Sequence, residues 1–409
     1  PSYGAVAVRQ TKKYFRYQSG KGYFWSTGTL FKPNYDVQSI SASGLGVGSV
    51  ITVTTDNIDH GLQVGATVRL TNILTSGYNG TYTVNSIVSD YVFTVVATNS
   101  LGAINAVLDI DCRVYVTQWT GACVRAGMFD DQNGLFWEFD GNRLYVVRRS
   151  STTQMTGTIS ATLNSSLITG TSSRFTQQIK AGDKIILRGM THFVSYVAND
   201  TTAYITPDYR GVTASGIKAS MIKELRIPQN EFNIDTIDGN GPSGYNIDLG
   251  KMQMMALQFS WYGAGFIDFM CRASDGNFIT AHRIKNNNVN DEAYMRSGNL
   301  PVRYSIENDC PVSFLTIPMD ATQNTIPIQE TKFFPNTGIV YIDNEIITYN
   351  GKSTMSGTGN LTNAVRNYTM SQYQSGVTYN LTAGANTSHA AANGVIMIQT
   401  TCSPTLSHW

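Results

Sequence analysis

The chain has 409 residues, of which 42% are hydrophobic and only 14% are Asp, Glu, Lys or Arg. This length predicts several domains, because a single hydrophobic core rarely serves more than about 250–300 residues. The charged fraction is low compared with the roughly 25% of a typical soluble domain. The net charge is +1, so long-range attraction to nucleic acid or to an anionic membrane is not expected. No apolar run approaches the roughly 18–20 residues of a membrane span, so no membrane insertion is expected.

The start of the chain and its cysteines both point to a reducing compartment. The stretch Pro1–Val6 lacks the basic and then apolar pattern of a signal peptide, so we expect synthesis in the cytoplasm. The five cysteines are widely scattered and have no metal-ligand spacing: Cys112, Cys123, Cys271, Cys310 and Cys402. Reduced, mostly buried thiols are therefore expected.

Strand patterns dominate the whole chain. Apolar clusters are short, alternate with polar residues and are rich in Val, Ile, Thr, Tyr and Phe, with Gly, Asn, Asp or Ser at their ends. This pattern predicts an all-β protein. The one helical candidate is Asp291–Arg296.

Two segments resemble copies of one small β module, at residues 38–112 and 151–224. In the first, Gly65 precedes an alternating strand that contains Val68, and in the second Gly182 precedes a strand that contains Ile185. Each glycine is expected in the turn before its strand. A looser third copy falls within residues 321–409, where Gly338 precedes another alternating run.

The remaining residues, 1–37, 113–150 and 225–320, are expected to form one discontinuous jelly-roll or β-sandwich core. The modules would then be insertions at its loop tips, where added domains are tolerated. Within the core, the run Trp261–Phe269 contains two glycines, which predict a β-bulge or a close backbone approach. In the tail, the apolar strand Gly394–Ile398 needs cover from the third module or from a partner.

Candidate catalytic and ligand-binding motifs are weak. Gly239–Gly244 matches the GxGxxG pattern, but Pro242 interrupts it and strand-like residues follow, so we interpret it as a loop. Glu138 and Asp140 share one face of a strand, which is typical of a glycosidase pair or of a solvent-facing strand edge. His282 is expected to pack or hydrogen-bond. The Asn-rich stretch 286–291 lacks the carboxylates of a tight calcium site, so no catalytic residue, cofactor or metal is predicted.

Aromatic residues gather near the start of the chain together with basic ones. Such a pattern can stack on nucleic acid, but Tyr, Trp and Arg are also the favoured anchors of protein interfaces. We favour a strand or arm that docks on a neighbouring subunit. The interface residues predicted on this basis, with the C-terminal tryptophan, are Tyr14, Phe15, Arg16, Tyr17, Tyr23, Phe24, Trp25 and Trp409.

An ordered series of short motifs resembles the structural proteins of tailed bacteriophages. The series comprises Tyr14–Lys21, Gly127–Gly134, Leu144–Ser150, Phe232–Asp235 with Gly239–Gly241, Trp261–Ile267, His282 and Leu300–Tyr304. The stretch from Gly338 to Tyr349 is similar to the small β modules that phages add to such proteins. The resemblance implies a jelly-roll core with inserted modules and a non-enzymatic component of the virion.

Three hypotheses follow from the sequence. The first is a structural subunit of the tail, baseplate or fibre region that makes symmetric contacts with copies of itself and with other virion proteins; a head-decoration or head-fibre protein is the variant of this hypothesis. The second is an adhesin that binds a receptor or a host surface glycan. The third is a glycan hydrolase that uses Glu138 and a partner carboxylate.

Overall fold

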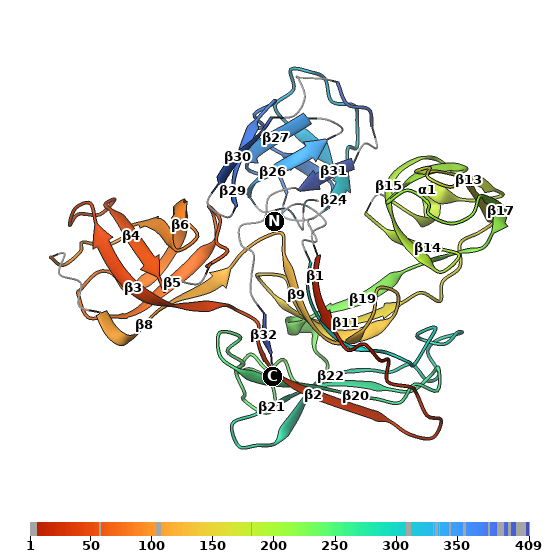
Figure 1. Cartoon of the computed structure of the whole chain (residues 1–409), viewed down its shortest axis with the longest axis horizontal. Helices are drawn as coiled ribbons and strands as arrows, with labels where there is room; N and C mark the ends of the chain where they lie inside the picture. Colours follow the sequence, from red (N-terminus) through yellow and green to blue (C-terminus); the bar gives the residue numbers. More distant parts are fainter. Residues whose placement is uncertain are drawn as a thin grey trace.

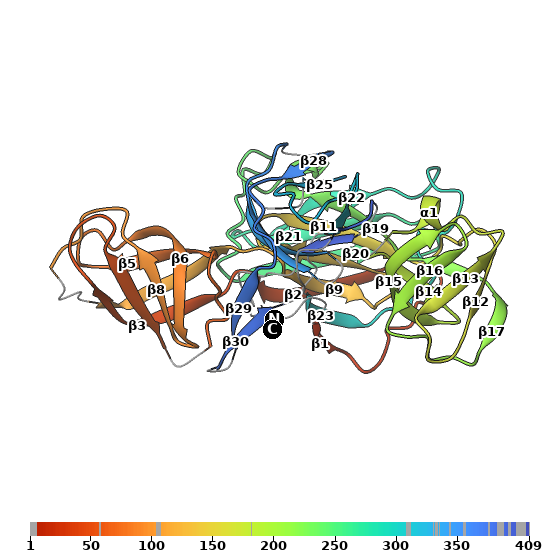
Figure 2. The ribbon, with the colours of Figure 1, turned by 90° about the horizontal axis from the view of Figure 1, so that it is seen from above.

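The computed structural model describes residues 6–56, 59–103, 108–180, 182–307, 312–329, 331, 334, 336–342, 345–354, 357–374, 377–382, 388–391, 394–397 and 406–408. It confirms the predicted fold class, an all-β chain with a discontinuous β-sandwich core and small β modules. Figure 1 shows the sandwich at the bottom and three modules around it, and Figure 2 shows the first and second modules at opposite ends of the long axis.

Helix is almost absent from the described residues. There is one α-helix, α1 (Phe175–Gln178), and one short 3-10 helix, η1 (Gln229–Glu231). The helical prediction for Asp291–Arg296 is wrong, because the backbone there is tied to a distant turn: the Tyr294 N–H donates to the carbonyl oxygen of Gly263 at 2.9 Å. The described residues include no helix that is long and apolar enough to cross a membrane.

The sandwich consists of two antiparallel sheets assembled from distant parts of the chain. Sheet I holds, in spatial order, β1 (Val6–Gln10), β23 (Val302–Glu307), β9 (Cys123–Phe129), β10 (Gly134–Phe139), β11 (Leu144–Ser150) and β19 (Lys223–Pro228). Sheet II holds β22 (Phe278–Ile284), β21 (Ile267–Arg272), β20 (Gln253–Phe259), β2 (Tyr23–Leu30) and β32 (Ser407–His408).

The two sheets meet face to face around Trp137 of β10. This indole is fully buried, and its N–H donates to the backbone oxygen of Ala256 in sheet II at 3.3 Å. Its ring packs edge-on against Phe269 and Phe232, at centroid distances of 5.5 and 6.0 Å. Aromatic pairs in this arrangement add to the stabilisation that burial alone provides.

The predicted bulge near Trp261–Phe269 is present, but the glycines do not form it. The register shifts between Phe269 and Met270, where β21 pairs with β22. Gly263 and Gly265 lie in the turn between β20 and β21. A Cβ at Gly265 would stand 1.8 Å from the oxygen of Ser260, so the close backbone approach accounts for that glycine.

The first module is a closed six-stranded barrel inserted between β2 and β9. Around the barrel the order is β3 (Asn34–Ala42), β4 (Val50–Thr55), β7 (Val92–Val96), β6 (Gly80–Ser89), β5 (Thr67–Ile73) and β8 (Leu108–Gln118). The long strand β8 closes it by pairing with both β5 and β3.

The second module, inserted between β11 and β19, repeats this order. Its strands run β12 (Thr158–Ala161), β13 (Leu167–Thr171), β16 (Thr202–Thr206), β15 (Met190–Asn199) and β14 (Lys184–Leu187). Two short strands take the place of β8: β17 (Ala214–Ile217) pairs with β12, and β18 (Ala219–Met221) pairs with β14.

The turn glycines of these two modules match closely. Gly65 and Gly182 have φ values of 93° and 88°, a conformation that favours glycine. The Gly65 N–H donates to Val84 at 3.0 Å, and the Gly182 N–H donates to Val194 at 2.7 Å. The predicted pairing of these two glycines is therefore confirmed.

The third module follows the same order, with a hairpin added. Its strands are β24 (Val312–Phe314), β25 (Ile326–Ile328), β28 (Gly359–Leu361), β27 (Glu345–Asn350), β26 (Thr337–Ile342) and β31 (Gly394–Met397), and the extra hairpin is β29 (Thr369–Gln374) with β30 (Val377–Thr382). Ladders join β25 to β28, β27 to β26, β26 to β31 and β31 to β24. Isolated bridges at Leu315–Ile328 and Lys352–Leu361 complete the ring. Gly338 differs from its two counterparts because it lies inside β26.

The apolar cores show how the units are joined. The core of the first module is continuous with that of the sandwich, whereas the second and third modules have cores of their own. Cys112, Cys123 and Cys271 are buried, as expected; Cys310 and Cys402 lie outside the described residues. The residue boundaries proposed for the four units stay a prediction.

Candidate functional site

The predicted interface segment, residues 14–17, runs along the edge of the sandwich. The Phe15 N–H donates to the oxygen of Leu300 at 2.9 Å, and the Tyr17 N–H donates to the side chain of Asn299 at 2.7 Å. The backbone is therefore docked on the chain's own sandwich. The side chains of Tyr14 and Phe15 are each 46% exposed, and Arg16 is exposed as well.

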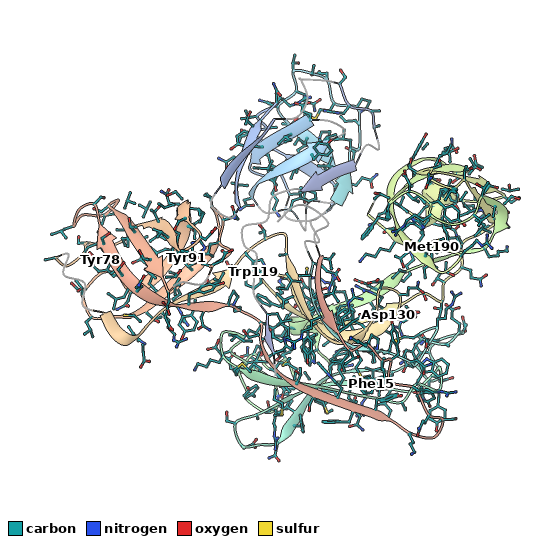
Figure 3. The ribbon with its side chains drawn as sticks, in the orientation of Figure 1. Phe15, Tyr78, Tyr91, Trp119, Asp130 and Met190 are labelled. Carbon is teal, nitrogen blue, oxygen red and sulfur yellow. The ribbon has the colours of Figure 1, made fainter. Side chains whose placement is uncertain are left out.

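Tyr14 faces an acidic loop of sheet I. Burial, and then the nearby Asp130 carboxylate, raises the pKa of the Tyr14 hydroxyl, which hydrogen-bonds to that carboxylate. Asp131 in the same loop pairs with Arg303 at 2.8 Å. Figure 3 places Phe15 and Asp130 on the part of the sandwich that lies beneath the second module, where Met190 is labelled.

Tyr17 belongs to an aromatic cluster with Tyr23, Trp261 and Tyr262. The centroid of its ring lies 6.2, 5.4 and 6.0 Å from theirs. Tyr262 is 57% exposed, and its φ is 37°, a conformation that residues with a side chain rarely adopt. Such strain persists only where the surroundings impose it. Here the Tyr262 N–H donates to the Tyr17 hydroxyl at 3.4 Å.

Phe24 lies in a second apolar group, on the outer face of sheet II. It is 54% exposed and packs edge-on against Phe278, which is 39% exposed, at 5.4 Å. The guanidinium of Arg272 stands 5.5 Å over the Phe278 ring and 3.8 Å from the sulfur of Met254. We call these four residues the sheet II patch.

One of the predicted interface residues, Trp25, is not part of these surfaces. Trp25 alternates with Phe24 along β2 and therefore points inward, where it is 8% exposed and part of the hydrophobic core. Trp409 lies outside the described residues. The sequence singled out the right stretch of β2 but did not separate its two faces.

A buried ion network covers the outer face of sheet I, and the sequence analysis did not find it. Glu138 is 1% exposed, so the prediction of a solvent-facing strand edge is wrong. Its carboxylate accepts from the Arg125 Nε at 2.6 Å and also from Arg226. Arg125 reaches Glu307 in addition, and Lys184 of the second module lies 3.7 Å from Glu307.

The same network spans the base of the second module. Arg149 and Glu224 are paired residues of β11 and β19, the strands that flank this insertion, and the Arg149 Nε donates to the Glu224 carboxylate at 2.7 Å. Burial would raise the pKa of Glu224, but Arg149 and its neighbours outweigh that effect and lower it to about 2. Glu307 behaves likewise: burial opposes ionisation, yet Arg125 and Lys184 lower the pKa of its carboxyl.

This arrangement does not suit Glu138 to general acid catalysis. Two guanidinium groups hold its carboxylate and the residue is 1% exposed, so the carboxyl is not within hydrogen-bonding reach of a substrate. The hydrolase hypothesis therefore gains no support from the geometry.

The other candidate motifs have structural roles. The Asp235 carboxylate accepts from the backbone N–H groups of Ile237 and Ser243 at 2.8 Å each, so the glycine-rich stretch 239–244 is a loop folded around Asp235. His282 is buried, burial lowers its pKa, and its Nδ1 accepts from the Asn233 N–H at 3.2 Å. Asn286 is also buried, where it accepts from Arg148 at 2.8 Å. Within the described ranges, no group of three or more His, Cys, Asp or Glu residues could hold a metal ion.

Comparison with known proteins yields no match, whether to models of protein families, to curated proteins or to solved structures.

Proposed function

We propose that the chain is a non-enzymatic structural subunit of a tailed-phage particle, placed in the tail, baseplate or fibre region. In this proposal it makes symmetric contacts with copies of itself and contacts with other virion proteins. It is synthesised in the host cytoplasm and becomes part of the virion. The resemblance of the ordered sequence motifs to phage structural proteins supports the virion assignment.

The observation that carries the proposal is the sheet II patch. Soluble monomers rarely leave large aromatic and methionine side chains together on an exposed sheet face. Aromatic residues, Met and Arg are the residue types enriched in protein interfaces, and Phe24, Met254, Arg272 and Phe278 are of these types. In Figure 1 the three modules leave the sheet II side of the sandwich uncovered.

The aromatic cluster around Tyr17 supports the same proposal. Tyr14 and Phe15 extend the exposed aromatic area along the edge of the sandwich next to β1, all five residues of which are exposed. Among the described residues β1 is an edge strand of sheet I, and such an edge can pair with a strand of another chain.

The test is the oligomeric state of the purified chain, measured by light scattering and by electron microscopy of negatively stained particles. We expect a symmetric oligomer for the wild type and a shift to monomers for the Phe24→Ser/Phe278→Ser variant. The matched control is Leu163→Ser/Val212→Ser, which removes two exposed apolar side chains from the second module and is expected to leave the oligomer intact. A wild-type chain that stays monomeric at high concentration would contradict the proposal, as would equal effects of the two double variants.

The virion assignment needs a separate experiment. An antibody against the second module should label intact particles at a fixed position when they are viewed by electron microscopy. Particles that carry no label, although the antibody binds the purified chain, would exclude the virion assignment.

A further inference from the structure

A pocket of about 310 Å³ lies where the first module joins the sandwich. Its walls come from both units: Arg69 is on β5, Tyr115 is on β8, and Lys32 lies between β2 and β3, while the loop 246–250 comes from the sandwich. The volume is at the lower end of the range of about 300–1,000 Å³ that is usual for small-molecule sites. It therefore suits a ligand of one sugar ring or similar size.

The walls of this pocket are held in place. The Lys32 N–H donates to the oxygen of Leu249 at 3.0 Å, which fixes the sandwich loop to the junction. The hydrophobic core runs without interruption through the junction, and both Phe31 and Val116 belong to it. A site with fixed walls loses little free energy to ordering when a ligand binds.

Two cationic side chains line the pocket, and neither forms an ion pair with another of the described residues. The Lys32 Nζ lies 5.1 Å from the ring of Phe139, and the Arg69 guanidinium lies 5.3 Å from the ring of Tyr115. Burial is the main cause of a lowered pKa of Lys32; the Asp248 carboxylate opposes this shift, and repulsion from Arg69 adds to it. Two neighbouring cations of this kind gain free energy from an anion placed between them.

The remaining lining residues define which anion fits. Asp248 is the one acidic residue of the lining, and it also lies 3.9 Å from Lys251, so the pocket has a net positive charge. A carboxylate placed between Lys32 and Arg69 lowers this positive charge. Asn246, Asp248 and Thr117 supply amide, carboxylate and hydroxyl groups, which are suitable partners for the hydroxyl groups of a sugar.

We propose that this pocket binds a carboxylate-bearing sugar unit. The sugar's carboxylate lies between Lys32 and Arg69, its ring lies beside Tyr115, and its hydroxyl groups face Asn246 and Asp248. This binding site does not depend on the assembly proposed above, because none of these residues belongs to the sheet II patch.

The experiment is a ligand-observed NMR titration of the whole chain with D-glucuronate and with N-acetylneuraminate. Three probes each lack one feature of the ligand. The methyl ester of D-glucuronate lacks the charge, D-glucose lacks the carboxylate, and acetate lacks the ring. We expect at least one acidic sugar to bind. The ester and glucose should bind about tenfold more weakly or worse, since neither offers a charged acceptor to Lys32 and Arg69.

Variants locate the binding. Lys32→Met and Arg69→Gln should each weaken binding of the acidic sugar about tenfold, while Lys285→Met, which removes an exposed lysine elsewhere on the sandwich, should have no effect. Thermal unfolding of each variant shows that the fold is retained.

Several results would overturn the proposal. They are failure of both acidic sugars to bind, equal binding of glucose or the ester, equal binding of acetate, and undiminished binding by the Lys32→Met and Arg69→Gln variants. None of them would bear on the oligomeric state of the chain, so this test is separate from that of the proposed function.

Discussion

The first and second modules share one strand order but are joined to the sandwich in opposite ways. Phe31, in the connection from β2 to β3, is fully buried. It belongs to the hydrophobic core that the first module shares with the sandwich. The second module keeps its own core, around Ile185 and Phe175, and meets the sandwich through polar contacts such as Lys184–Glu307. The pair Arg149–Glu224 joins the two sandwich strands from which this module emerges. Repeated barrels can therefore be attached either by apolar continuity or by charge, and the two attachments respond to different perturbations.

The largest expected effect comes from removing apolar contact at the first junction. Phe31→Ala should lower the free energy of unfolding by about 3–5 kcal/mol, as is usual for a fully buried phenylalanine. Because the core is shared, the first module and the sandwich should lose stability together. Calorimetry, with hydrogen exchange to assign each transition, measures both.

The control for this variant is Ile185→Ala, which truncates a fully buried side chain in the separate core of the second module. It should destabilise the second module and leave the exchange protection of the sandwich unchanged. Loss of protection across the whole chain in this control would show that the cores are not separate.

Arg149→Met tests the charged attachment. The guanidinium donates to Glu224 at 2.7 Å and to the backbone oxygen of Asp130 at 2.8 Å. Its removal leaves these acceptors without a donor, and we expect a loss of about 3 kcal/mol. The loss should fall on the base of the second module, as measured by hydrogen exchange of β11 and β19, and unchanged exchange there would refute this role.

Acid should weaken the second attachment more than the first. The pKa of Glu224 is about 2 in the folded chain, against an ordinary value of 4.5. A carboxyl whose pKa is depressed by folding stabilises the fold fully above its unfolded pKa, and this stabilisation is lost as the pH falls toward the folded pKa. Because the Glu224 side chain is partly exposed to solvent, screening reduces the effect, and about 1 kcal/mol should be lost between pH 4.5 and about pH 3. Glu224→Gln should abolish this part of the pH dependence of denaturant unfolding.

The stability of the first module should also depend on pH, but more weakly and at a higher pH than the effect of Glu224. His60 is buried, and burial lowers its pKa below 6.5. The folded state therefore favours the neutral ring, so its contribution to stability is complete above pH 6.5 and declines as the pH falls below that value. The stability of the first module should decrease slightly from pH 7.5 to 5.5 in the wild type and stay level in His60→Gln. A slope that survives in this variant would assign the effect to another group.

Much of the fold could be predicted from the sequence, because strand alternation and turn glycines are local signals. Gly65 and Gly182 revealed the repeat because each occupies a conformation that favours glycine. The third copy was harder to recognise, because Gly338 lies within a strand and an extra hairpin separates β28 from β31.

The candidate surfaces could be predicted only in part. Tyr14, Phe15 and Phe24 are exposed as an interface requires, but Phe278 and Met254 join Phe24 only through sheet pairing that no local pattern reveals. The same holds for the ion network. The alternation of Glu138 with Trp137 is typical of a half-exposed strand, and only the arginines of two other strands explain why Glu138 is buried.

Strand β32 pairs with β2 of sheet II, and its His408 also stacks on Tyr304 of sheet I at 3.9 Å. This attachment has a mechanical consequence. Each of the three modules is a side loop that leaves the sandwich and returns to it. A pulling force applied between β1 and β32 would therefore be borne by the ladders of the sandwich, and the modules would carry none of the tension until those ladders broke.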